Sequence, residues 1–103
     1  MDKLLIKPEH LKMLNDIFKS YCPNAEIWAY GSRLNGNAHE GSDLDLVVKS
    51  FNSDECYILQ LQEIITNSNI PFLVDLHQYD SLSDSFHDEI LKNYVVIYNG
   101  AKT

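Results

Sequence analysis

The sequence predicts an α/β (α+β) domain in which helices pack on a small mixed β-sheet. Segments with helical and strand periodicity alternate along the chain, in the order helix, strand, loop, strand, helix, strand, helix, strand. No internal repeat, low-complexity tract or linker rich in Pro, Gly or Ser interrupts them. A chain of 103 residues has the size of one compact domain, so we expect residues 1–103 to form a single unit.

The first half of the chain contains one expected helix and two expected strands. Residues 8–21 repeat apolar side chains at helical spacing, with Pro8 in the first turn and Pro23 just past the end. Residues 25–30 are typical of a short strand that ends at Gly31. A polar, glycine-bearing stretch over residues 31–42 follows, and residues 43–49 predict the second strand.

The second half contains two expected helices and two expected strands. Asn52 and Glu55 stand three apart, a spacing typical of a helix-capping pair. The helix that follows is expected to end in the polar cluster at residues 67–69, and its apolar side comprises Tyr57, Ile58, Leu61, Ile64 and Ile65. Residues 71–77 predict a third strand, residues 83–92 a short helix, and residues 94–98 a terminal strand.

The charge balance argues against a protein that binds the phosphate backbone of a long nucleic acid. The net charge is −7, from 15 acidic and 8 basic side chains. Proteins that bind long nucleic acids normally present a basic face, and Arg33 is the one arginine of this chain. We therefore expect no direct nucleic-acid binding, although a short nucleotide carried in by metal ions remains compatible with the acidic surface.

The apolar runs and the cysteines indicate a cytoplasmic protein. No run approaches the roughly 20 apolar residues of a membrane span, and the N-terminal segment has no signal-peptide pattern. Cys22 and Cys56 form no C-x-x-C pair and no disulfide framework, which favours inert thiols in a reducing compartment.

Two carboxylates stand out on the second expected strand. Asp43 and Asp45 are two residues apart, so their side chains project from the same face while Leu44 and Leu46 point to the other. At a separation of about 4 Å, their repulsion would be on the order of 4 kcal/mol at an effective dielectric near 20. Either both side chains are solvated, or a hard divalent cation neutralises them.

A third carboxylate favours the cation. Asp75 interrupts an apolar strand between Val74 and Leu76, where an acid needs a partner, a sheet end or a site. If this strand lies beside residues 43–49, Asp75 joins Asp43 and Asp45. Three acids of this kind could hold two Mg²⁺ ions about 3.5–4 Å apart, the arrangement used for phosphoryl and nucleotidyl displacement.

The loop before the paired acids has features of a phosphate site. Gly31 directly follows a strand, and without a Cβ its backbone N–H can approach a phosphate closely. Ser32 adds a hydroxyl, and the planar guanidinium of Arg33 suits phosphate oxygens. For Arg33 a second interpretation stays open, in which it is a surface arginine paired with Glu40.

Other motifs fail or have simpler explanations. Asn35-Gly36 is first of all a turn signal. Gly31 and Gly36 fit the glycine spacing of a P-loop, but Asn37-Ala38 stand where that loop needs Lys and Ser or Thr. The histidines and cysteines lack zinc-ligand spacing, and His77 is a candidate for orienting Asp75, two residues before it on the same strand face.

The spacing of these residues resembles a known signature. Gly-Ser at residues 31–32, ten further residues and Asp-Leu-Asp at residues 43–45 reproduce the G-S-x(10)-D-x-D pattern of the DNA polymerase beta-like nucleotidyltransferase superfamily. Asp75, in the sequence V-D-L, resembles the third carboxylate of that superfamily. In length and element order the whole chain is similar to its minimal nucleotidyltransferase group, which implies the polymerase beta-like nucleotidyltransferase fold.

The resemblance also implies an activity and a partner. Proteins of this group are similar to antitoxins that act on a small helical HEPN partner, often an RNase toxin, and members use ATP and Mg²⁺ to transfer AMP to a tyrosine of that partner. By carry-over, Gly31 and Ser32 would hold the nucleotide phosphates. Asp43, Asp45 and Asp75 would bind the metal ions, two in number, and Asp75 would also help to activate the incoming hydroxyl.

Two other functions stay open at this point. The chain could be a binding module that neutralises a HEPN toxin by occlusion without turnover. It could also transfer a nucleotide to a small molecule, although enzymes of that kind resemble longer chains with an added helical domain. The sequence leaves open which nucleotide and acceptor are used, and whether the isolated chain forms a homodimer.

Overall fold

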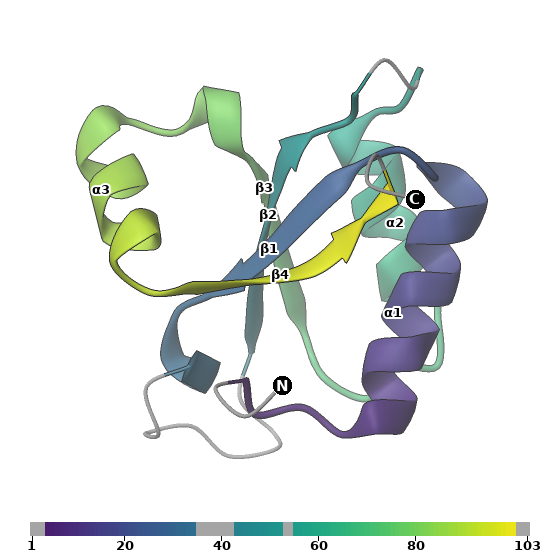
Figure 1. Cartoon of the computed structure of the whole chain (residues 1–103). Helices are drawn as coiled ribbons and strands as arrows, with labels where there is room; N and C mark the ends of the chain where they lie inside the picture. Colours follow the sequence, from purple (N-terminus) through teal and green to yellow (C-terminus); the bar gives the residue numbers. More distant parts are fainter. Residues whose placement is uncertain (1–3, 35–42, 53–54, 101–103) are drawn as a thin grey trace.

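The computed structural model, shown in Figure 1, contains one four-stranded sheet with helices on both sides. It describes residues 4–34, 43–52 and 55–100. The expected alternation of helices and strands is confirmed. The elements are α1 (Pro8–Tyr21), β1 (Glu26–Tyr30), the 3₁₀ helix η1 (Ser32–Leu34), β2 (Leu44–Ser50), α2 (Ile58–Thr66), β3 (Val74–Gln78), the 3₁₀ helix η2 (Tyr79–Ser81), α3 (Asp84–Lys92) and β4 (Tyr94–Asn99).

The sheet is mixed, as predicted, with the strand order β3-β2-β1-β4. β1 pairs antiparallel with both β2 and β4, whereas β2 and β3 run parallel. Parallel neighbours need a long crossover connection, and α2 provides it between β2 and β3. The carboxyl-bearing strands β2 and β3 are therefore adjacent and run in the same direction.

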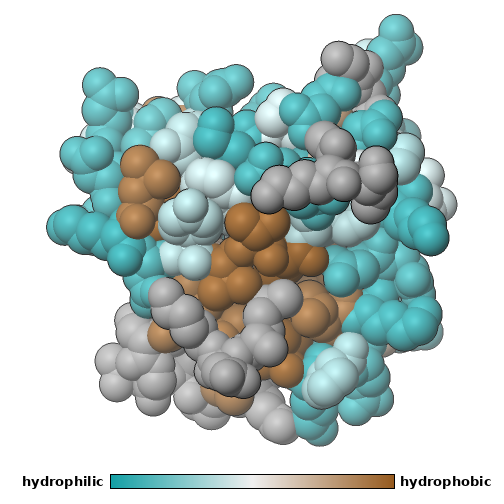
Figure 2. Space-filling model, in the orientation of Figure 1, coloured by the Kyte–Doolittle hydropathy of each residue, from teal (hydrophilic) through white to brown (hydrophobic). Residues whose placement is uncertain are grey.

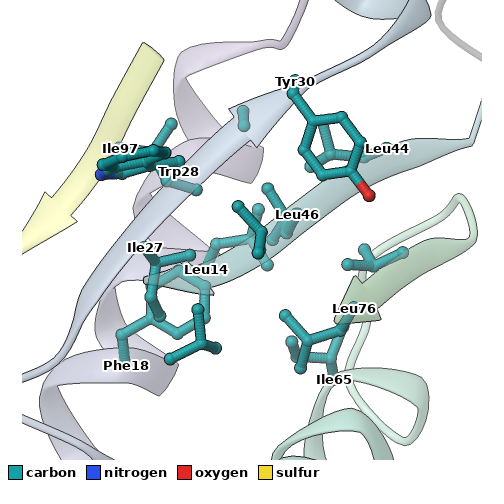
Figure 3. Packing of buried hydrophobic residues seen from close by; sticks show 14 of the residues in the cluster. Leu14, Phe18, Ile27, Trp28, Tyr30, Leu44, Leu46, Ile65, Leu76 and Ile97 are labelled. Carbon is teal, nitrogen blue, oxygen red and sulfur yellow. The ribbon is translucent and has the colours of Figure 1, made fainter. Parts of the chain in front are cut away.

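The hydrophobic core lies between the sheet and the helix pair α1 and α2. Figure 1 shows these two helices together on one side of the sheet and α3 on the other. In Figure 3, Leu14 and Phe18 of α1 lie under Ile27 and Leu46, and all four are fully buried. Because one face of the sheet is closed by this core, polar side chains of β2 and β3 are directed to the α3 side.

Several expected boundaries are confirmed. α1 spans Pro8–Tyr21, and Asn67 forms the C-cap of α2. Ser83 caps α3, because its hydroxyl accepts a hydrogen bond from the backbone N–H of Phe86 at 3.3 Å. Cys22 is buried, and the partly buried Cys56 donates from its thiol to the backbone oxygen of Tyr21 at 3.3 Å. Among the helices of the described ranges, none combines the length and apolar character that a membrane crossing requires.

Two details of the sequence interpretation are wrong. Asn52 and Glu55 do not cap α2, which begins after Tyr57 with no side-chain cap. Asn52 instead adopts a positive φ of 52° and donates from its side chain to the backbone oxygen of Asn24 at 2.9 Å. Tyr57 is 70% exposed, so it does not belong to the buried side of the helix.

The third strand is shorter at its start than expected. β3 begins at Val74, not at residue 71, and residues 71–72 form a bend. Pro71 has no backbone N–H to donate to a strand ladder, and Leu73 is 70% exposed, so this stretch gains little by extending the sheet.

Gln62 of α2 fastens the free edge of β3. Its side-chain Nε2 donates to the backbone oxygen of Val74 at 2.9 Å, and its Oε1 accepts from the backbone N–H of Leu76 at 3.2 Å. These are backbone groups that an added strand would use. Gln62 thus closes this part of the edge and holds β3, the strand of Asp75, in place.

We expect Gln62→Ala to lower the free energy of unfolding by about 1–2 kcal/mol, because two hydrogen bonds to β3 are lost. Urea denaturation of the variant and of the native chain measures the difference. Glu63→Ala, at the neighbouring exposed position of α2, is the matched control. A loss no larger than that of the control would contradict the role given to Gln62.

Candidate active site

Three carboxylates meet where β2 and β3 run side by side. Asp45 lies on β2, Asp43 stands one residue before that strand, and Asp75 lies on β3. The parallel register places Asp45 opposite Asp75. Leu44 and Leu46 are fully buried, so the alternation of strand side chains directs Asp43 and Asp45 to the opposite, α3-facing side of the sheet, as predicted. The expectation that Asp75 lies beside the paired acids is also confirmed.

The electrostatics of the group centre on Asp45. Asp43 and Asp75 are exposed, while Asp45 is half-buried. Burial raises the pKa of the Asp45 carboxyl above its ordinary value, and the negative charges of Asp75 and then Asp43 raise it further. His77 has the smallest effect and lowers the pKa of Asp45. The three acids therefore repel one another enough for the charge of Asp45 to be penalised.

Tyr30 belongs to this group, and the sequence interpretation missed it. It is the cross-strand partner of Asp45 and is only 8% exposed. Burial raises the pKa of its phenol to about 12, with further contributions from Asp45 and then Asp75. Figure 3 shows the hydroxyl directed away from β4, toward the β2–β3 side of the sheet. The available signal was its place just before Gly31, on a strand that can pair with residues 43–49.

His77 lies beside Asp75, as its spacing indicated. Its Nε2 is 3.3 Å from the Asp75 Oδ2, and both side chains are partly exposed, at 40% and 58%. A contact of this length and exposure adds little stability. The contact places His77 next to Asp75, where the sequence predicts a residue that could orient the site.

Gly31 is the residue that lets β1 end against Asp45. It has a φ of +87°, a conformation that L side chains rarely adopt. A Cβ at this position would overlap the Oδ2 of Asp45. The Asp45 carboxylate therefore occupies the space that a side chain at position 31 would need, so glycine is required for this turn and this carboxylate to lie side by side.

The remaining two predicted residues both lie in the 3₁₀ helix η1. Ser32 begins η1, and its side chain lies outside the described part of the structure. Arg33 is only 3% exposed; its Nη1 donates to the backbone oxygen of Leu5 at 2.7 Å, and its guanidinium carbon lies 4.3 Å from the centroid of the Phe72 ring. This burial favours a structural role for Arg33 over the predicted phosphate contact. Its other expected partner, Glu40, and the expected turn at residues 35–36 fall outside the described residues.

The donor chemistry of the three carboxylates fits a hard divalent cation. Mg²⁺ prefers carboxylate oxygens, and a cation held by these acids would offset the repulsion that, after burial, raises the pKa of Asp45. Within residues 4–34, 43–52 and 55–100, however, no group of three or more His, Cys, Asp or Glu side chains is placed so that it could hold a metal ion. The fit thus rests on the donor type and on the shared position of the acids.

Comparison with known proteins agrees with this arrangement. The model of the family described as polymerase beta, nucleotidyltransferase matches residues 12–103. A relative from Haemophilus influenzae, named probable protein adenylyltransferase MntA, is 37% identical over 102 residues, which cover 98% of this chain and 90% of that protein. Both matches include the residue ranges that contain Gly31 and the three carboxylates.

We expect Gly31→Ala to destabilise the fold by about 1–3 kcal/mol, through backbone strain and the overlap with Asp45. The same change in an Asp45→Ala background should cost less, because the carboxylate that it meets is gone. Urea denaturation of the four proteins in this double-mutant cycle measures the coupling. Equal costs in the two backgrounds would show that Asp45 does not restrict position 31.

The raised pKa of Asp45 predicts a pH-dependent stability. An acid whose pKa is higher in the folded chain binds protons more tightly there, so stability falls as pH rises from about 3.9, the ordinary Asp value, through the raised pKa. We expect Asp45→Asn to be more stable than the native chain at pH 7, with the difference shrinking as pH falls toward about 4. Thermal unfolding between pH 4 and 8 measures it. Asp88→Asn, at an exposed position of α3, controls for the loss of one negative charge, and a pH-independent difference would refute the prediction.

Proposed function

This chain belongs to the polymerase beta nucleotidyltransferase family, and on that premise we propose that it transfers AMP from ATP to a tyrosine hydroxyl of a helical HEPN toxin and so acts as an antitoxin. The family supports a nucleotide substrate. The name of the Haemophilus influenzae relative, a probable protein adenylyltransferase, supports a protein acceptor. The toxin and the tyrosine come from the resemblance of residues 31–45 and Asp75 to the minimal nucleotidyltransferase group.

The observation that carries the proposal is the pairing of Asp45 with Asp75 across β2 and β3, next to the turn at Gly31. This pairing brings the acids next to a glycine backbone that a phosphate can approach closely. A site for a nucleoside triphosphate needs both parts. In this proposal, Gly31 and Ser32 hold the phosphates. Arg33 takes no part, since its guanidinium is buried against Leu5 and Phe72.

Asp43, Asp45 and Asp75 would together hold two Mg²⁺ ions in this proposal. When bound, such ions neutralise the phosphates and stabilise the charge that develops during in-line displacement. The chain itself has a net charge of −7, so its own side chains offer a triphosphate little attraction. The acids are therefore assigned to cation binding, and the phosphates to the backbone and hydroxyl of residues 31–32.

Asp75 is also the group assigned to the acceptor hydroxyl. It is 58% exposed, so an incoming tyrosine can reach it, and His77, whose Nε2 lies 3.3 Å from its carboxylate, is assigned to orient it. In the proposed step, the tyrosine oxygen bonds to the α-phosphorus, the bond from that phosphorus to the β-phosphate bridging oxygen breaks, and pyrophosphate leaves. The phenolic proton passes to Asp75, which acts as general base.

The test is the intact mass of the HEPN partner after incubation with this chain, ATP and Mg²⁺. We expect the partner to gain one or more AMP masses. Asp43→Asn should abolish the gain, because it removes a cation ligand at an exposed position. Asp88→Asn on α3 is the charge-matched control and should retain the activity.

The same experiment separates the other functions. A partner whose mass is unchanged although it forms a stable complex with the chain would support neutralisation by occlusion. If the partner neither forms a complex with the chain nor changes in mass, the HEPN proposal is refuted. Another acceptor, such as a small molecule, is then favoured. Peptide mapping of a modified partner identifies the acceptor residue, and a residue other than tyrosine would correct that part of the proposal.

A further inference from the structure

The carboxylate group lies on the side of the sheet that α3 partly covers. Tyr30 and Asp45 are cross-strand partners, and Asp75 lies opposite Asp45, so the three residues form one row across β1, β2 and β3. The other face of the sheet is closed by the core against α1 and α2. A nucleotide whose phosphates reach this row therefore extends over the α3 side, where Figure 1 places that helix.

Most aromatic rings of this side are already stacked on protein groups. Trp28 lies on Tyr94 with ring centroids 4.2 Å apart, and Tyr79 lies on His87 at 3.8 Å. The ammonium of Lys49 lies 4.6 Å from the centroid of the Tyr79 ring. These contacts occupy the faces that a planar ligand would need, and Trp28 itself is 6% exposed.

Phe86 of α3 is different. It is 40% exposed, and its ring stands edge-to-face against Tyr30, with centroids 5.9 Å apart and an interplanar angle of 86°. Since Tyr30 is the cross-strand partner of Asp45, Phe86 contacts the Tyr30 end of this row, and the Tyr30 ring separates it from the carboxylates. In a nucleotide, the ribose similarly separates the α-phosphate from the base.

We propose that Phe86 is the stacking surface for the base of the nucleotide whose phosphates are held by residues 31–32, beside the cation-binding acids Asp43, Asp45 and Asp75. This inference rests on the proposed nucleotidyltransferase site and adds the residue that binds the base. Stacking of a base on an aromatic ring is favourable and tolerant of base identity, because every base has a π-face. Phe86 therefore contributes to the affinity for nucleoside triphosphates in general and selects little between ATP and GTP.

The experiment compares two probes in the isolated chain, Mg·ATP and Mg·tripolyphosphate, by calorimetric titration. Tripolyphosphate has the three phosphates without ribose or base. We expect Phe86→Ala to weaken ATP and GTP binding about tenfold and to leave tripolyphosphate binding unchanged. Phe86→Trp should retain or improve nucleotide binding, because it keeps an aromatic face.

Two further variants separate stacking from packing. Phe86→Leu keeps an apolar side chain on α3 without a π-face, and should lose nucleotide affinity as Phe86→Ala does. Leu91→Ala removes another half-exposed apolar side chain of the same helix and should bind both probes normally. Native affinity in Phe86→Leu, or equal losses for ATP and tripolyphosphate in Phe86→Ala, would overturn the proposal.

These outcomes are independent of the acceptor. A native chain that binds ATP through Phe86 but leaves the HEPN partner unmodified would refute the proposed transfer and retain the base-stacking role. If the native chain modifies its partner but Phe86→Ala leaves ATP binding unchanged, the base-stacking role is refuted and the proposed transfer is retained. A native chain that binds ATP no more tightly than tripolyphosphate would also overturn the role of Phe86.

Discussion

The parallel pairing of β2 with β3 is the interaction on which the candidate site depends. It sets Asp45 directly opposite Asp75 and so creates a concentration of negative charge. Burial and the neighbouring acids raise the pKa of Asp45, so its charged form opposes folding. Their position is maintained by apolar residues on the same strands, since Leu44 and Leu46 are fully buried against the helices α1 and α2. The core on one face thus fixes an unfavourable charge arrangement on the other.

Two local devices complete that arrangement. Gly31 ends β1 with a positive φ, and the space that a side chain would take is occupied by the Asp45 carboxylate. Gln62 of α2 binds the backbone of β3 at Val74 and Leu76, which secures the strand that bears Asp75. Gly31 leaves room for the Asp45 carboxylate, and Gln62 holds the edge strand that bears Asp75. Both residues therefore act on the same pair of carboxylates.

The two sides of the sheet have different roles. The α1–α2 side contains the fully buried Leu14, Phe18 and Leu61 and supplies stability through apolar burial. The α3 side contains the carboxylate row, Tyr30 and the rings around Trp28. Figure 2 shows a large apolar area in the centre of the viewed face and a smaller one to its left, with hydrophilic residues around them. The carboxylates and the partly exposed ring of Phe86 share the α3 side of the sheet, where the proposed chemistry would take place.

The sequence by itself determined the order of the elements and the span of α1, and it singled out Asp43, Asp45, Asp75 and Gly31 as candidates, because periodicity, turn residues and motif spacing are local properties of the chain. The tertiary structure decided the partners. Arg33, expected at a phosphate, is buried on Phe72, and Asn52, expected to cap α2, binds Asn24. Tyr30 gained its place beside Asp45 only when β1 and β2 paired. Such contacts join residues distant in sequence, and their free energies depend on burial and register, which no local pattern encodes.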